Sequence, residues 1–175
     1  GKQAPEGSPL RADLRETGEI AQTALDNVRG LSQTLHPSIL DELGLESTID
    51  WYVSTAERQL GIRVAYERTG TPVSVDPTSA IHVYRVLQEA VSNVARHSGA
   101  DRADVRLRFD PGALTLEIED AGRGMDADTA RRGLGLVAMR ERAALLGGTI
   151  DFLRPPDGGT LVRLWIPLNQ PSQPA

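Results

Sequence analysis

The sequence contains no cysteine among its 175 residues, which excludes disulfides, thiol nucleophiles and cysteine-ligated zinc or iron–sulfur sites. Its three histidines, His36, His82 and His97, leave little material for a histidine-rich metal site. Aromatic residues make up only 4% of the chain, so the core must be largely aliphatic. No uninterrupted apolar run approaches the roughly 18 residues of a membrane-spanning helix, so we expect no membrane span.

Acidic residues outnumber basic ones, 24 to 19, and the formal net charge is −5. A chain of this charge is a poor candidate for binding nucleic acid or an anionic membrane through bulk charge, so we predict no direct nucleic-acid binding. Charged residues at 25% and hydrophobic residues at 39% are typical of a globular chain. The length suits one medium domain, or a smaller domain with an appendage.

The composition divides the chain into four parts. Residues 1–9 are rich in Gly, Pro and Ser, without an initiator Met or an apolar signal region, and we expect a disordered tail or a tag remnant. Residues 10–44 are expected to form a helix and a linker, because apolar residues between Leu10 and Leu35 recur at near-heptad spacing. This helix either pairs with a partner helix or packs within a single domain. Residues 45–168 form the main domain, and residues 169–175 a frayed tail.

The hydrophobic periodicity of the main domain predicts three helices and five strands. We expect the second of these helices to be capped by Asp76 or Ser79, and the first to end at Gly61. The order is not an alternation of strands and helices, so it predicts an α+β fold: a mixed, mostly antiparallel sheet with helices on one face. The expected helices span about 45–60, 78–97 and 136–146, and the expected strands 62–66, 105–109, 114–118, 149–153 and 160–166.

A polar stripe runs along the helix expected at 78–97. Arg85, Glu89, Asn93 and His97 are spaced four apart, which places them on one side of a helix. Carboxylate and carboxamide oxygens are ligands that Mg²⁺ prefers, and the stripe could also orient a water or hydroxyl. On an arbitrary helix, a stripe of this kind is more often simply solvated.

Two glycine motifs are candidates for close contact between backbone and ligand. Asp120, Gly122 and Gly124 follow directly on a predicted strand, where an acidic side chain and two glycines permit such an approach. Gly133 and Gly135 open a helix, and free N–H groups at a helix N-terminus bind phosphate well. Each motif alone is more often an ordinary turn, and neither matches the P-loop or the dinucleotide-binding fingerprint.

The order and spacing of the motifs are more specific than any one of them. E-x-x-x-N at 89–93, D-x-G-x-G at 120–124, G-x-G-L at 133–136 and G-G-T at 158–160 resemble the conserved elements of the GHKL ATPase family. That family includes gyrase-type topoisomerases, heat-shock and mismatch-repair ATPases, and histidine kinases. The resemblance covers roughly residues 61–168 and implies a two-layer α/β sandwich of the GHKL type, here preceded by a dimerisation-type helix.

Within the family, the chain resembles sensor histidine kinases of the nitrate-sensor-like class. The stretches Arg85–Ala100 and Arg132–Ile150 are similar to the nucleotide-site elements of that class, and Val28–Ile49 to the end of its second dimerisation helix and linker. Only eight residues separate Gly124 from Gly133, which suits the short ATP lid of the class.

The resemblance implies that ATP and Mg²⁺ bind here. Asn93 would hold the Mg²⁺, Glu89 would act as general base toward a substrate histidine, and Asp120 would accept a hydrogen bond from the adenine amino group. The other implied nucleotide contacts are Gly122 and Gly124 at the start of the lid, Gly133, Gly135 and Leu136 at the phosphates, Thr160 at the adenine end, and Arg96 and His97 as basic residues facing phosphate.

None of the three histidines matches the phosphoacceptor of the class, which lies early in the first dimerisation helix. We therefore expect that helix to be absent here, and expect this chain to bind ATP without phosphorylating itself. The implied partners are the phosphoacceptor and dimerisation helix of a homodimeric parent kinase and a cognate response regulator. The implied location is the cytoplasmic part of a membrane-anchored parent.

The sequence leaves two other hypotheses about the function open. An anti-sigma-factor-type serine kinase shares the ATP-binding fold, although it needs no dimerisation helix such as the one suggested by Val28–Ile49. A non-catalytic scaffold of the same fold is the second, and the intact Glu89, Asn93 and Asp120 argue against it. A topoisomerase-like ATPase is disfavoured by the short lid.

Overall fold

The computed structural model describes residues 38–125 and 133–168. The chain divides into two compact units, residues 1–38 and 39–175, and the description below concerns the second. Several predictions fall outside the described residues: the tails at 1–9 and 169–175, the helix between Leu10 and Leu35, His36, and all but the first residue of the expected lid at 125–132.

The main domain has the predicted order of helices and strands. α2 begins earlier than the predicted 45–60 helix because Gly44, with a φ of 77°, joins a first helical segment to a second one across a kink. Gly61 follows α2 with a φ of 70°, as expected of a residue that ends a helix. The described elements are α2 (Ser38–Leu60), β1 (Arg63–Thr69), α3 (Pro77–Asn93), η1 (Val94–Ser98), β2 (Arg102–Asp110), β3 (Ala113–Asp120), α5 (Leu134–Leu145), β4 (Thr149–Leu153) and β5 (Thr160–Pro167).

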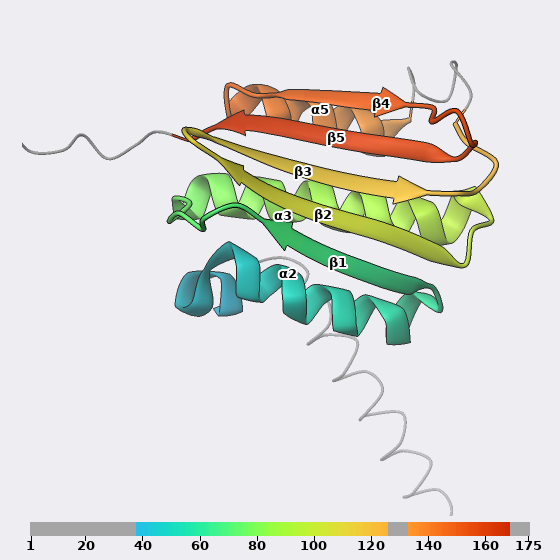
Figure 1. The fold of residues 1–175 in the computed structure, drawn as a ribbon, viewed down its shortest axis with the longest axis horizontal. Helices are drawn as coiled ribbons and strands as arrows, with labels where there is room; N and C mark the ends of the chain where they lie inside the picture. Colours follow the sequence, from blue (N-terminus) through green and yellow to red (C-terminus); the bar gives the residue numbers. More distant parts are fainter. Residues whose placement is uncertain (1–37, 126–132, 169–175) are drawn as a thin grey trace, which may run out of the picture. The chain divides into compact units, whose positions relative to one another are not determined.

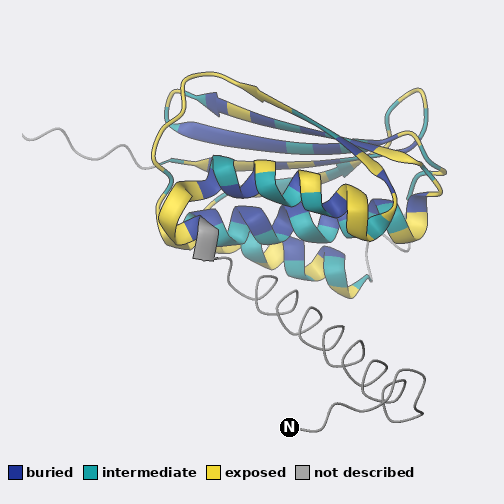
Figure 2. Cartoon of the chain, turned by 90° about the horizontal axis from the view of Figure 1, so that it is seen from below, coloured by how far each residue is buried: buried dark blue, intermediate teal, exposed yellow. Residues whose placement is uncertain are grey.

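The five strands form one sheet in the order β1-β2-β3-β5-β4 (Figure 1). β1 pairs with β2 in parallel and all other neighbours are antiparallel, which confirms the predicted mixed, mostly antiparallel sheet. β2 and β3 are joined by the predicted turn at Pro111-Gly112, where Gly112 has a φ of 76°. α2, α3 and α5 cover one face of the sheet, as predicted (Figures 1 and 2).

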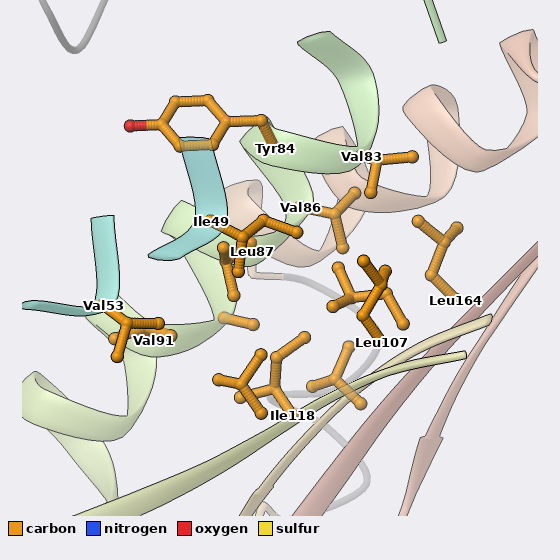
Figure 3. Close-up of a cluster of buried hydrophobic side chains, with 14 of the residues drawn as sticks. Ile49, Val53, Val83, Tyr84, Val86, Leu87, Val91, Leu107, Ile118 and Leu164 are labelled. Carbon is orange, nitrogen blue, oxygen red and sulfur yellow. The ribbon is translucent and has the colours of Figure 1, made fainter. Parts of the chain in front are cut away.

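The core lies between α3 and the sheet. The predicted apolar face of this helix is buried: Val83, Leu87, Ala90, Val91 and Val94 are all in the core cluster. They meet side chains from alternate positions of the strands, such as Leu107 and Ile118, while Ile49 and Val53 of α2 close the cluster at one side (Figure 3).

The opposite face of the sheet carries cross-strand ion pairs. Arg106 of β2 pairs with Glu117 and Glu119 of β3, and the Nε of Arg163 on β5 lies 2.6 Å from the Oε1 of Glu117. The strands therefore alternate between apolar side chains toward the helices and charged ones away from them, which is the pattern of a sheet with one covered face. Within the described residues, no helix is both long and apolar enough to span a membrane.

α3 begins with the predicted cap and ends differently from the prediction. The Ser79 N–H donates to Oδ1 of Asp76 at 2.9 Å, so Asp76, and not Ser79, caps the helix. We predicted one α-helix over 78–97, but the α-helix ends at Asn93 and the next turn, η1, is π-helical. Apolar periodicity could not reveal this change, because Val94 is the last buried apolar residue of the helix and the next buried residue, Ser98, is polar.

The buried position of Leu87 gives a test of the core. Leu87 is 0% exposed, and Leu87→Ala should lower the free energy of unfolding by about 2–5 kcal/mol because it leaves a cavity. Leu145→Ala on α5, where the side chain is 72% exposed, is the matched control and should change it by less than about 0.5 kcal/mol. Urea unfolding of both variants measures the difference, and equal losses would contradict the packing described.

The Asp76 cap should make stability depend on pH in acid. Hydrogen bonds from Ser79 lower the pKa of this carboxyl below its usual 3.8, so its stabilisation is present above that value and is lost as pH falls through the folded-state pKa. Asp76→Ala should cost about 0.5–2 kcal/mol at neutral pH, whereas Asp76→Asn keeps a capping side chain that does not titrate. Unfolding measured between about pH 6 and pH 2 should show the wild type losing its advantage over Asp76→Ala, while Asp76→Asn keeps its own. An advantage of the wild type that is unchanged by acid would contradict the assignment.

Candidate nucleotide-binding site

The D-x-G-x-G motif forms a loop directly after β3. Asp120 is the last residue of that strand, is only 6% exposed and is aligned in register with Ala103 of β2 and Thr160 of β5. Its Oδ1 accepts a hydrogen bond from the Gly122 N–H at 2.8 Å. The carboxylate is thus held at the end of a central strand by the loop that follows it.

This loop packs closely against the end of the helix that carries the polar stripe. The Arg123 N–H donates to the carbonyl oxygen of Ser98 at 2.9 Å. A Cβ on Gly122 would overlap that same carbonyl oxygen and would lie 2.7 Å from the Cβ of Ser98. Only glycine therefore fits at position 122 without displacing one of the two segments.

The G-G-T turn before β5 packs against the same loop from another side. Gly159 has a φ of 78°, and a Cβ there would overlap the carbonyl oxygen of Asp120. A Cβ on Gly124 would lie 2.9 Å from the carbonyl oxygen of Gly159 and 3.4 Å from the Nε of Arg154. The predicted adenine-end residues thus come together, with backbone in contact with backbone.

The G-x-G-L motif opens α5 beside Glu89. Gly133 precedes the helix without a side-chain cap, and the first hydrogen bond of the helix runs from the Val137 N–H to the Gly133 carbonyl at 3.0 Å. The backbone N–H groups before Val137 have no partner within the helix, and the helix dipole places partial positive charge there. A Cβ on Gly135 would overlap Oε1 of Glu89, so this carboxylate lies against the start of α5.

Together, α3 and η1 connect the two glycine-rich regions. Glu89 touches the start of α5, and Ser98, nine residues further on, touches the D-x-G-x-G loop. Nine helical residues span roughly 13 Å. Asn93 lies between these contacts at the end of α3 and is half-buried, whereas Arg96 and His97 of η1 are exposed.

Some residues of the predicted motifs have fewer contacts with the glycine-rich segments, or contacts of another kind, than Glu89 and Asp120 have. Leu136 is only 4% exposed and belongs to the core cluster, so its side chain packs inside the domain. Thr160 is half-buried and is placed next to Asp120 by strand register alone. Arg85, at the start of the polar stripe, donates a hydrogen bond from its Nη1 to the Oε1 of Gln88 on the same helix at 2.9 Å.

Ser98 contacts the D-x-G-x-G loop, and the Arg154 side chain lies near Gly124; neither residue was predicted as a site residue. In the sequence, Ser98 indicated no more than the end of a helix, and Arg154 only a position in a turn. Their role in the site depends on contacts between distant segments, which no local pattern records.

Burial, with a further contribution from Arg142, lowers the pKa of His82 on α3 below its usual 6.5. Among the described residues, no group of three or more His, Cys, Asp or Glu side chains is placed to hold a metal ion.

Two glycines with similar φ, Gly159 and Gly61, give a test of the close approach between the G-G-T turn and Asp120. Gly159→Ala should destabilise the domain by about 2 kcal/mol or more, because the new Cβ adds an overlap with the Asp120 carbonyl to the cost of a left-handed φ. Gly61 has a φ of 70° and nothing within 4 Å of an added Cβ, so Gly61→Ala should show only the cost of a left-handed φ for alanine, about 1–2 kcal/mol. Denaturant unfolding compares them, and a Gly61→Ala loss as large as that of Gly159→Ala would contradict the contact.

A family model described as "Histidine kinase-, DNA gyrase B-, and HSP90-like ATPase" matches residues 78–170. The oxygen sensor histidine kinase NreB of Staphylococcus carnosus is 35% identical over 152 residues, which cover 86% of this chain and 44% of that protein. The chain therefore spans less than half the length of this curated relative.

Solved structures with a similar fold include two kinases. The histidine kinase domain of a blue-light activated kinase from Erythrobacter litoralis matches with a TM-score of 0.61 and 27% identity, over 71% of this chain and 61% of that one. The histidine kinase AdeS of Acinetobacter baumannii matches with a TM-score of 0.59 over 97% of this chain and 89% of that one, and at 20% identity this likeness concerns the fold alone. From the family match and the site geometry, the chain belongs to the histidine kinase-, DNA gyrase B- and HSP90-like ATPases and contains the ATP-binding catalytic domain of a sensor histidine kinase.

Proposed function

We propose that this domain binds ATP with Mg²⁺ along the end of α3 and transfers the γ-phosphoryl group to a histidine of the parent kinase outside the described domain. The observation that carries the proposal is that α3 and η1 contact the start of α5 at Glu89 and the D-x-G-x-G loop at Ser98, while the G-G-T turn packs against that loop. These segments are far apart in sequence, and each supplies a group suited to a different part of a nucleotide.

The base would bind at Asp120. Its Oδ1 is used by the Gly122 N–H, which leaves Oδ2 to accept a hydrogen bond from the exocyclic amino group of adenine. A carboxylate fixed by its own loop and buried at a strand end is well placed for this, because a charge-assisted hydrogen bond is strong when the acceptor is held in position. Thr160, its register neighbour, would support the same end of the base.

The phosphates would lie toward the start of α5. The N–H groups there that have no partner within the helix, together with the dipole of the helix, favour negative charge. Asn93 would supply an oxygen ligand to Mg²⁺, which when bound neutralises charge on the phosphates. The exposed Arg96 and His97 would face the phosphate chain from η1.

Glu89 is suited to act on the attacking histidine. An imidazole nitrogen of the acceptor would attack the γ-phosphorus, the bond to the bridging oxygen would break, and ADP would leave with that oxygen. Glu89 would accept a hydrogen bond from the other ring nitrogen and so orient the imidazole and stabilise its developing positive charge. Its contact with Gly135 at the start of α5, where the phosphates are proposed to lie, supports this role.

The similarity to NreB supports the rest of the signalling assignment. We infer that the parent is a homodimeric sensor kinase, that its dimerisation and phosphoacceptor helix meets this domain, and that an aspartate of a response regulator receives the phosphoryl group. The domain would act in the cytoplasm.

Nucleotide titration of three variants tests the proposal. By calorimetry, Asp120→Asn should weaken ATP and ADP binding by roughly 10- to 100-fold with or without Mg²⁺, because an ionised acceptor is lost. Asn93→Ala should remove only the part of the affinity that depends on Mg²⁺. Asp151→Asn, at an exposed position of β4, is the control and should bind as the wild type does. A wild type that does not bind ATP, or an Asp120→Asn variant with unchanged affinity, would contradict the proposal.

A further inference from the structure

The change from α-helix to π-helix at the end of α3 is stabilised by one side chain. Ser98, the last residue of η1, is only 8% exposed. Its hydroxyl donates to the carbonyl of Val94 at 2.8 Å and accepts from the N–H of Ala100 at 2.9 Å. A widened turn of this kind is energetically poor by itself and is often found at functional sites, so its supporting contacts matter.

These two hydrogen bonds determine where the Ser98 backbone points. The first ties the residue back to the start of η1, and the second ties it forward to the chain that enters β2. Gly99 completes the turn with a φ of 75°. The Ser98 carbonyl is thereby aimed at the D-x-G-x-G loop, where it accepts the Arg123 N–H at 2.9 Å.

The same carbonyl limits the position of the whole loop. Gly122 lies so close that a Cβ there would overlap the Ser98 oxygen, and the Gly122 N–H in turn holds Oδ1 of Asp120. A shift of Ser98 would therefore move Arg123 and Gly122, and through Gly122 the carboxylate.

We propose that Ser98 is a positioning residue for nucleotide binding: its hydroxyl fixes the π-helical turn whose carbonyl holds the D-x-G-x-G loop and, through that loop, Asp120. This inference rests on the proposed function, because it assumes that Asp120 binds the base. It assigns Ser98 to the base end of the site, separate from Asn93 at the phosphate end.

The assignment has a signature that general loss of stability would not produce. If Ser98 acts through Asp120, loss of its hydroxyl should weaken adenosine, ADP and ATP with Mg²⁺ by the same factor. A variant that acted at the phosphates would leave adenosine binding unchanged and weaken the longer nucleotides.

The test compares Ser98→Ala with Ser54→Ala in the full chain by calorimetric titration with the three ligands. Ser54 is a matched control, because its Oγ also donates to a carbonyl four residues earlier at 2.8 Å, but on an exposed part of α2. Ser98→Ala should weaken all three ligands by about five- to tenfold, since the Ala100 N–H loses its partner. Ser54→Ala should leave them unchanged. Loss confined to ATP and ADP, or no loss, would overturn the inference.

Amide hydrogen exchange without nucleotide keeps the test independent of the proposed function. The Arg123 amide should exchange at least about fivefold faster in Ser98→Ala than in Ser54→Ala, because its acceptor is no longer held in place. Ser98→Cys keeps the same number of side-chain heavy atoms, although sulfur is larger than oxygen, and forms weaker hydrogen bonds. It should show the same loss if Ser98→Ala does not fold. An unchanged exchange rate of the Arg123 amide would overturn the inference for Ser98. A wild type without nucleotide affinity would overturn the proposed function, and the exchange rate would then still decide whether Ser98 positions the loop.

Discussion

Burial of the apolar face of α3 against the sheet and α5 is the constraint on which the candidate site depends. α3 contacts β3, β5 and α5, and its inward residues belong to the fully buried part of the core. With that face fixed, Glu89 is held at the start of α5, and Ser98 at the loop after β3. Because a closely packed core resists displacement, the two ends of the site are kept at one separation. The core therefore contributes to function by setting the distance between groups proposed to bind the base and the phosphates.

The glycines of the site also allow close packing within the domain. The place that a Cβ would take is occupied by the Ser98 carbonyl at Gly122 and by the Asp120 carbonyl at Gly159. At Gly135 it is taken by the Glu89 carboxylate. These glycines thus allow the D-x-G-x-G loop to pack closely on η1 and the G-G-T turn, and the start of α5 to pack closely on α3, and the shape of the region results from that packing. This also explains why glycine is needed at positions where the ligand itself would not touch a side chain.

Most of the fold could be predicted from the sequence because each element has a strong local signal. β4 at Thr149–Leu153 has the predicted bounds, and the mixed sheet followed from the order of the elements. The early start of α2 and the π-helical turn at Val94–Ser98 could not be predicted, since both depend on backbone geometry at single residues. In the site, the motifs predicted Glu89, Asn93 and Asp120 as candidates. Ser98 and Arg154 could not be predicted, because they lie beside the D-x-G-x-G loop only through the packing of segments distant in sequence, which leaves no local pattern.

The central claim is that a nucleotide binds along the end of α3 between the loop after β3 and the start of α5. The most direct measurement is backbone amide chemical shifts of the chain, recorded with and without ATP and Mg²⁺. We expect the largest changes at Ser98, Gly122 to Gly124 and Gly133 to Leu136, with little change on the outer face of the sheet around Arg106 and Arg163. Changes confined to that outer face, or no changes at saturating nucleotide, would contradict the claim.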